Sequence, residues 1–346
     1  MTLRTSRIVL LLALLPIAAA LIGFGLNRSE ASLAAMPRLR IDPQRIAVAG
    51  FSSGAVMAQQ FHLAFSDKLV GAVLLSGPPY GCAEGSLDLA LSRCMKGEPQ
   101  PPDAAALARQ VQQRVARGEL APLDGLAGDR VLALHGKSDM LVATAVARAS
   151  LGIYEALPQA ASMHLHWDGE GDFAHVWPST TAGGDCNATA PPYIGHCGRD
   201  LAQEAMQAMF DAPRQPAAAA TGELTLVGMP ALSDGDATSL DEAAVLYRPA
   251  RCAGENACGL LLVFHGCEQE RARIGDTFAR DSGFNRWADA HDVVVLYPQA
   301  RSTYLPLNPK ACWDWWGYSG PDYDTRSGRQ LRAVAAAAAA LGAPFD

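Results

Sequence analysis

The residues with the clearest chemical potential lie in the segment Arg45–Met57, which contains the pattern G-x-S-x-G. Its serine is Ser52, and Gly50 and Gly54 lie two residues to either side. Glycine at both positions permits a strained turn in which a larger side chain would clash. A serine at the tip of that turn exposes its hydroxyl for nucleophilic attack on an acyl group. The backbone N–H of Ser53 would then lie where negative charge develops on an oxyanion.

The residues around the pattern supply the elements that such a turn needs. Ile46–Ala49 is an apolar run suited to a buried strand, and Ala55–Ala64 is typical of the helix that follows. The pattern alone would occur by chance in a chain rich in glycine and alanine. Its position between a strand and a helix favours a nucleophile.

A serine hydroxyl needs a base to take its proton and a carboxylate to orient that base. Asp139 follows the predicted strand Arg130–Leu134, and His175 follows the predicted strand Ser162–Trp167. The chain order Ser52, Asp139, His175 is the order found in α/β-hydrolases. We therefore predict that these three residues form a catalytic triad.

Other polar residues compete for the same roles. His135 lies inside the turn after its strand and is expected to be structural. His164 and His166 alternate along a strand, so one face of that strand is expected to be core, and His62 lies on the helix after the serine. Asp172 is too close in sequence to the predicted base to reach around it easily.

Strands and helices alternate along most of the chain, which predicts a mostly parallel central sheet with helices on both faces. Glu223–Met229 and Ala243–Arg248 are expected to pair as antiparallel strands, and Cys82–Pro102 is expected to be irregular. The stretch Ala212–Thr221, rich in proline and alanine, is interpreted as a surface connection because neither half is complete alone. We therefore expect a single α/β-hydrolase catalytic domain over residues 37–346.

One predicted element is out of the usual order. The second oxyanion donor of such enzymes comes from a strand-end turn upstream of the nucleophile. Here the matching strand, Gly259–Phe264, enters His265-Gly266-Cys267 downstream of the triad. Joining the C-terminal helix Gln330–Leu341 to the strand before the serine would restore the usual order. We therefore predict a circular permutation; the alternative is a second half-domain with an unrelated turn.

Composition and the N-terminus bear on partners and location. The chain of 346 residues is 49% hydrophobic with a net charge of −7, so nucleic acid is not an expected partner. Arg4 and Arg7 precede the apolar run Ile8–Ile22, which is typical of a secretory signal. We predict a signal peptide or N-terminal anchor in residues 1–36, and therefore a secreted or periplasmic protein, membrane-anchored if the segment is uncleaved.

Together these motifs resemble the catalytic domain of the poly(3-hydroxybutyrate) depolymerases, in the circularly permuted type. The resemblance covers nearly the whole mature chain and rests on Gly50–Met57; His135-Gly136 with Asp139; Ala174–Pro178; Cys186-Asn187, Pro192-Tyr193-Ile194 and Cys197; His265-Gly266-Cys267; Cys312–Gly317; and Ser327-Gly328.

The resemblance implies a serine esterase that hydrolyses poly(3-hydroxybutyrate), or other short-chain polyhydroxyalkanoates and their oligomers. Its triad would be Ser52, Asp139 and His175, and the amides of Ser53 and Cys267 would form the oxyanion hole. No metal or other cofactor is expected, and we expect a monomer. Many secreted relatives append a separate polymer-binding domain that we do not recognise here, so oligomers and amorphous polymer are equally plausible substrates.

The eight cysteines are an even number without a C-x-x-C pair, which favours disulfides in an exported protein over thiolate metal ligands. Sequence alone leaves their pairing open. Local spacing favours Cys82–Cys94, Cys186–Cys197 and Cys252–Cys258, and leaves Cys267 to pair with Cys312. That last bond would tie the oxyanion turn to an aromatic cluster; the alternative for Cys267 is a reactive thiol.

The aromatic cluster is expected to bind an apolar polyester. Its members are Trp313, Trp315, Trp316 and Tyr318, and we expect Trp177 to contribute as well. Trp313 has a competing assignment to the core, because large aromatic side chains are mostly buried. Several adjacent aromatics cannot all face inward from one loop, so at least one is expected to be exposed as an adsorption surface.

Two other functions fit the same residues. Another secreted esterase, of the feruloyl or acetylxylan type, would share the fold and the triad. A catalytically silent protein with the same fold would bind polymer or membrane without turnover. Covalent labelling of Ser52 distinguishes the silent protein from either esterase.

Overall fold

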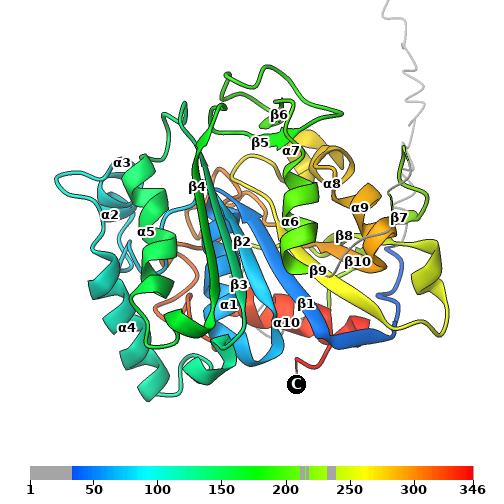
Figure 1. Ribbon diagram of the computed structural model, residues 1–346, viewed down its shortest axis with the longest axis horizontal. Coiled ribbons are helices and arrows are strands. Elements are labelled where there is room, and N and C mark those ends of the chain that lie inside the picture. The colour runs from blue at the N-terminus through cyan, green and yellow to red at the C-terminus, as the bar shows by residue number, and fades with distance from the viewer. Residues whose placement is uncertain (1–32, 211–214, 216–217, 232–238, 346) are drawn as a thin grey trace, which may run out of the picture. The chain divides into compact units, whose positions relative to one another are not determined.

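An eight-stranded sheet forms the centre of the structure, a computed structural model shown in Figure 1. The model describes residues 33–210, 215, 218–231 and 239–345, and the chain from Leu33 onward forms one compact unit. Residues 1–32 of the predicted signal or anchor segment and part of the predicted connection Ala212–Thr221 lie outside the described residues. Within those residues, no helix is long and apolar enough to cross a membrane.

The strands lie side by side in the order β4-β3-β2-β1-β9-β10-β8-β7. Neighbouring strands from β4 to β10 run parallel, and β8 and β7 continue the sheet antiparallel. The predicted mostly parallel sheet and the predicted antiparallel pairing of β7 with β8 are therefore confirmed, and β8 also pairs antiparallel with β10. The bounds are β1 Ile41–Phe51, β2 Gly71–Leu75, β3 Arg130–Gly136, β4 His164–Gly171, β7 Glu223–Gly228, β8 Ala243–Arg248, β9 Cys258–Phe264 and β10 Val293–Tyr297.

Strand β1 lies at the middle of the sheet, and its successive residues from Ile46 to Phe51 are apolar because both faces of the strand are covered. Ala49 and Phe51 pack into the apolar cluster on one face of the sheet, and Ile46 and Val48 pack into the cluster on the other. Each of these side chains is almost fully buried. A parallel strand that is covered on both faces has no solvent-facing position for a polar residue.

Helices cover both faces, as predicted (Figure 1). One face is covered by α1 Ser53–Ala64, α4 Ala104–Ala116, α5 Thr144–Glu155 and α10 Arg329–Leu341, which share one apolar cluster. The other face is covered by α6 Leu201–Met209, α8 Thr277–Asp281 and α9 Phe284–His291, which share the second cluster. The helices thereby hold the sheet rigid beneath the loops at the C-terminal ends of its strands.

The strand order and the chain ends confirm the circular permutation. Strand β9 pairs directly with β1, with Phe264 in register with Gly50. The backbone N–H of Leu39 donates to the carbonyl oxygen of Leu341 at 2.8 Å, so the end of α10 lies against the residues that lead into β1. Joining these two points would place β9, β10, α10 and β1 in consecutive order, which is the usual order of the fold.

The segment Cys82–Pro102 corrects the sequence prediction, because it contains helices α2 Leu87–Leu91 and α3 Arg93–Lys96. The side chain of Ser86 caps α2 by accepting a hydrogen bond from Leu89 N at 3.3 Å. Both helices are too short to show a hydrophobic period. The same limit applies to β5 Trp177–Ser179 and β6 Ile194–His196, which form a small separate sheet, and to α7 Arg271–Ile274.

Candidate active site

Ser52 lies in the sharp turn between β1 and α1, as its pattern predicts. Its backbone has φ 55° and ψ −122°, a strained conformation for a residue other than glycine. A Cβ atom on Gly50 would lie 1.9 Å from the carbonyl oxygen of Gly54. A Cβ atom on Gly54 would lie 2.2 Å from the carbonyl oxygen of Phe264. Both glycines are therefore required by close backbone approach.

His175 and Asp139 form a buried pair on loops that follow β4 and β3. The Nδ1 atom of His175 lies 2.6 Å from Oδ2 of Asp139, and both residues are less than a tenth exposed. The other carboxylate oxygen, Oδ1, accepts hydrogen bonds from the backbone N–H groups of Leu141 at 2.8 Å and Val142 at 3.0 Å. The carboxylate is thus fixed on both sides, and it holds the imidazole with its Nε2 atom free to face the serine.

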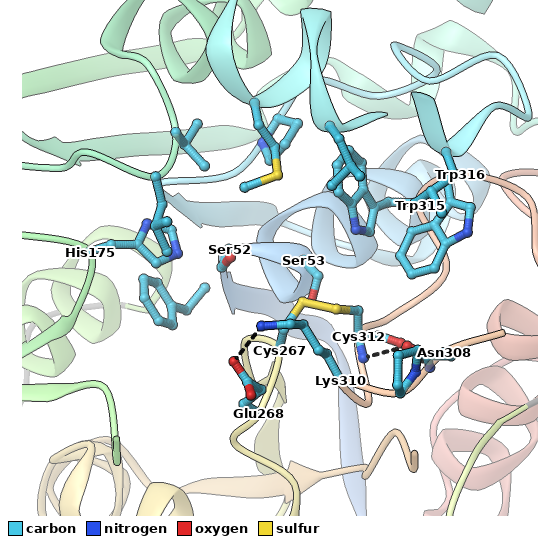
Figure 2. Close-up of a pocket in the computed structure, with 18 of the residues that line it drawn as sticks. Ser52, Ser53, His175, Cys267, Glu268, Asn308, Lys310, Cys312, Trp315 and Trp316 are labelled. Carbon is cyan, nitrogen blue, oxygen red and sulfur yellow. Dashed lines mark hydrogen bonds and ion pairs between the residues drawn. A yellow bond between two sulfur atoms is a disulfide. The ribbon is translucent and has the colours of Figure 1, made fainter. Parts of the chain in front are cut away.

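The electrostatics of this pair favour an ionised carboxylate. Burial raises the pKa of Asp139, but the hydrogen bond and charge of His175 outweigh burial, and the Val142 amide adds to them. The pKa of Asp139 therefore lies below its ordinary value. The ring of His175 packs on Phe51 with 4.7 Å between ring centroids. Figure 2 shows that His175 and Ser52 face the same cavity.

Two backbone amides belong to segments that line the same cavity as Ser52. The N–H of Ser53 belongs to the first turn of α1, where helical amides have no partner within the helix. The N–H of Cys267 follows β9, beside β1, and Cys267 lines the same cavity. Among the described residues, neither amide donates a hydrogen bond. Both are available to an oxyanion.

A neutral histidine supports the turn that carries Cys267. Burial lowers the pKa of His265 to about 4, so its ring is uncharged at neutral pH. Its Nδ1 atom lies 2.7 Å from the carbonyl oxygen of Gly266, and its Nε2 atom accepts the Ala300 N–H at 3.1 Å. The Gly266 N–H in turn donates to Oε1 of Gln269 at 2.7 Å. The turn is fixed from both ends by these bonds.

Four disulfides are present, in the pairing that local spacing favours. They are Cys82–Cys94, Cys186–Cys197, Cys252–Cys258 and Cys267–Cys312. The last one joins the turn after β9 to the aromatic loop, with 4.2 Å between the Cα atoms. Cys267 is therefore no free thiol, which excludes the alternative of a reactive cysteine.

The competing polar residues have partners of their own, although His135 Nδ1 also lies 3.8 Å from Asp139 Oδ2. His62 is fully buried, 2.9 Å from Asp129 Oδ2 and 2.8 Å from the Tyr154 hydroxyl. His135 is buried beside the Ser76 hydroxyl at 3.2 Å, and burial lowers its pKa. Asp172 is exposed and lies 3.6 Å from a lysine. None of these residues lines the cavity.

The cavity beside Ser52 has a volume of about 390 Å³ and an almost entirely apolar wall. Leu87, Leu91, Met95, Leu141, Val142 and Leu307 line it, together with Trp315 and Trp316. Leu87 and Leu91 belong to α2, which the sequence analysis missed, although their spacing of four residues suits one face of a helix. An apolar cavity with a few polar groups at one end is typical of a small-molecule site.

The structure corrects three of the five aromatic residues predicted to bind substrate. Trp177 and Trp313 are fully buried in the core, where their Nε1 atoms donate to the carbonyl oxygens of Ser282 and His265. The Tyr318 hydroxyl donates to the carbonyl oxygen of Cys312 at 2.8 Å, and Tyr318 does not line the cavity.

The two remaining tryptophans line the cavity but do not protrude from the surface. Trp315 is 8% exposed and Trp316 is half-buried. The loop is drawn inward by the buried carboxylate of Asp314, which accepts the N–H groups of residues 316–319. The expected exposed tryptophan is therefore absent from this loop.

A serine at a strand-to-helix turn, a histidine–aspartate pair and two free amides on this sheet define an α/β-hydrolase. Comparison with protein-family models gives no match. A poly(3-hydroxybutyrate) depolymerase of Delftia acidovorans is 31% identical over 322 residues, or 92% of this chain and 63% of that protein. A polyhydroxybutyrate depolymerase of Talaromyces funiculosus is 29% identical and covers 89% of this chain and 93% of its own length.

Comparison with solved structures finds similarity to the same kind of protein. The crystal structure of a PHB depolymerase from Penicillium funiculosum matches with a TM-score of 0.79 at 25% identity, over 90% of this chain and 99% of that one. A PHB depolymerase complexed with an R3HB trimer matches in fold with a TM-score of 0.77. The chain is therefore similar in both sequence and fold to polyhydroxybutyrate depolymerases. It spans a little less than two thirds of the bacterial relative's length.

Proposed function

We propose that this protein is a serine esterase that hydrolyses the ester bonds of poly(3-hydroxybutyrate) and of its oligomers. The observation that carries the proposal is the placement of Ser52, the His175–Asp139 pair and two unpaired amides at one end of an apolar cavity. The names of the relatives, and the trimer bound to one structural neighbour, support this substrate class.

In the acylation half of the reaction, Ser52 Oγ attacks the ester carbonyl carbon while His175 Nε2 takes the hydroxyl proton. The developing oxyanion accepts the N–H groups of Ser53 and Cys267. Asp139 remains ionised and stabilises the imidazolium, as its lowered pKa favours. The bond between the carbonyl carbon and the ester oxygen then breaks, and His175 gives its proton to that oxygen. The departing 3-hydroxybutyrate unit leaves as an alcohol, and the acyl group stays on Ser52.

In the second half, a water molecule replaces the alcohol. His175 takes a proton from the water, which attacks the acyl carbonyl through the same oxyanion contacts. The bond to Ser52 Oγ breaks, the serine recovers its proton from His175, and the acid product leaves. Every step uses groups of this chain and water alone.

The rim of the cavity suits an apolar polyester. Leu87, Leu91 and Leu307 are 37%, 53% and 54% exposed at the cavity, and Tyr304 and Leu305 beside Leu307 are more than four-fifths exposed. Exposed apolar side chains gathered at one mouth mark an interaction surface. These leucines, rather than the tryptophans, are the adsorption surface that we assign to insoluble polymer.

The protein is proposed to act outside the cytoplasm. Four disulfides among the described residues are typical of proteins that fold in an oxidising compartment. The predicted export signal agrees, and whether it is cleaved or kept as an anchor stays a prediction. We also propose a monomer with residues 37–346 as the catalytic domain.

A turnover panel tests the proposal. It measures kcat/KM for the 3-hydroxybutyrate trimer, amorphous poly(3-hydroxybutyrate), p-nitrophenyl butyrate and a methyl ferulate ester. The proposal predicts turnover of the first three. Preferred turnover of the ferulate ester would favour a feruloyl-type esterase, and no turnover at all would favour a silent binding protein.

A further inference from the structure

A small polar cluster interrupts the apolar wall of the cavity. Its members are Tyr193, Glu268 and Lys310, which all line the cavity. Figure 2 shows the last two side by side. The proposed catalytic groups and Asn308 account for the other polar side chains there. The Asn308 amide is bonded on both sides to the backbone of Cys312, so it is not available to a ligand. The cluster needs an explanation, because an internal segment of a polyester carries no charge.

The negative charge of Glu268 is stabilised by two cations and a hydroxyl group. Its Oε2 atom accepts from Lys310 Nζ at 3.0 Å and from the Tyr193 hydroxyl at 3.2 Å, while Oε1 pairs with Arg273. Burial raises the pKa of Glu268, but its bonds to Lys310 foremost, and to Tyr193 and Arg273, hold the pKa below its ordinary value. Arg273 also lies 3.3 Å from Glu270. Among the described residues, Glu268 is the only acidic partner of Lys310, and it is shared with Arg273.

Backbone contacts fix the segment from which the Lys310 side chain extends. Glu268 has φ 63°, and its N–H donates to the carbonyl oxygen of Lys310 at 2.7 Å. The Cys267–Cys312 disulfide joins the same two segments one residue before Glu268 and two residues after Lys310. The Lys310 side chain is 64% exposed. An ammonium group has three donors, so those not used by Glu268 remain for a ligand.

We propose that Lys310 binds the free terminal carboxylate of a 3-hydroxyalkanoate oligoester, with the terminal unit as the leaving alcohol. The inference rests on the proposed function. Glu268 directly follows the proposed oxyanion donor Cys267, and its partner Lys310 lines the same cavity as Ser52. We therefore infer that the Lys310 ammonium lies on the side of the cavity that would hold the scissile carbonyl. In the last ester of an oligomer, the carboxylate is only a few bonds from that carbonyl carbon. We therefore expect the enzyme to hydrolyse oligomers preferentially at the ester bond nearest their free carboxylate.

The experiment compares two trimers of 3-hydroxybutyrate, one with a free carboxylate and one with a neutral primary amide at that end. Internal ester cleavage is followed by chromatography, and kcat/KM is measured for both. We expect the wild type to favour the free acid about tenfold, the effect of one charge-assisted hydrogen bond. Lys310→Met should bring the ratio to about one, and Lys310→Arg should keep most of the preference. Increasing salt should weaken the preference in the wild type.

Lys96→Met is the matched control. The Lys96 ammonium donates to the carbonyl oxygens of Met140 at 2.9 Å and Leu141 at 3.2 Å, close to the cavity, but Lys96 does not line it. This variant should keep the wild-type ratio. Because each ratio compares two substrates on one preparation, a loss of folded protein cancels.

The outcomes separate the two proposals. Equal cleavage of both trimers by the wild type, or a preference that survives in Lys310→Met, would overturn the role of Lys310 and leave the esterase intact. If neither trimer is cleaved, the proposed function fails, and the role of Lys310 fails with it.

Discussion

Replacing Asp139 by asparagine exchanges one carboxylate oxygen of the site for an amide nitrogen. The oxygen that remains is held by the N–H groups of Leu141 at 2.8 Å and Val142 at 3.0 Å. These two bonds fix the orientation of the asparagine side chain, so its NH₂ group must take the place of Oδ2. In the wild type, Oδ2 lies 2.6 Å from His175 Nδ1. Two donors cannot share that contact, and the ring must present Nδ1 as an acceptor.

The consequence for the rate follows from the tautomer. With Nδ1 as the acceptor, the proton of the neutral ring lies on Nε2, which then cannot take the proton of Ser52. Asp139→Asn should therefore lower kcat for p-nitrophenyl butyrate by about 10⁴, as the equivalent change does in other serine hydrolases. The fold should persist, because the amide still forms all three hydrogen bonds. The assay is kcat together with the melting temperature.

The chain contains a matched control for this experiment. Asp129 forms a second buried histidine–aspartate pair with His62 at 2.9 Å, at the other end of β3 and away from the cavity. Asp129→Asn should lower the melting temperature but change kcat by less than about twofold. More than a tenth of wild-type kcat in Asp139→Asn would refute the assigned role of this residue, and an equal loss in both variants would point to folding.

Two further changes test the surroundings of the site. Removing the Cys267–Cys312 bond with a double serine variant should lower kcat by about 100-fold or more, because the bond holds an oxyanion amide in place. Removing Cys252–Cys258, at the opposite end of β9, should lower stability alone, and equal kcat in the two variants would contradict this account. Burial raises the pKa of Asp324 to about 6, against the opposing charge of Arg114. A carboxyl whose pKa is raised by folding stabilises the fold fully below about pH 4, and this contribution is lost as the pH rises through 6. The free energy of unfolding in urea should therefore depend less on pH between 4 and 6 in Asp324→Asn than in the wild type. The same pH dependence in both proteins would contradict this assignment.

The central elements of the fold were predictable because local chemistry determines them. The second half of strand β1, Ile46–Phe51, has no solvent-facing position, so its sequence is apolar. The turn at Ser52 requires glycine at two fixed positions, where a Cβ atom would touch backbone. The turn at His265 lies after the predicted triad in the sequence, whereas the usual fold has this turn before the nucleophile. This difference indicated the permutation, and β9 does pair with β1 in the structure.

The orientation of the aromatic loop was not predictable in the same way. Its direction depends on the Asp314 carboxylate, which binds four successive backbone N–H groups and is itself buried. Burial raises the pKa of Asp314, and those bonds oppose the effect. One aspartate in a segment rich in tryptophan gives no sign of this arrangement. The sequence therefore suggested exposed tryptophans where the structure has half-buried or buried ones.

The polar cluster at Lys310 was missed for a related reason. Lys310 and Glu268 are 42 residues apart, and only the folded chain brings their charges within 3.0 Å. Nothing in the local pattern of either residue distinguishes it from an ordinary surface charge. Long-range pairs of this kind depend on tertiary structure.

Covalent labelling of Ser52 tests the central claim most directly. The protein is treated with a fluorophosphonate, digested, and the modified peptide is mapped by mass spectrometry, with and without the 3-hydroxybutyrate trimer. We predict one stoichiometric adduct on Ser52, slowed by the trimer and absent from Ser52→Ala. An adduct on another residue, or no adduct on folded protein, would contradict Ser52 as the nucleophile.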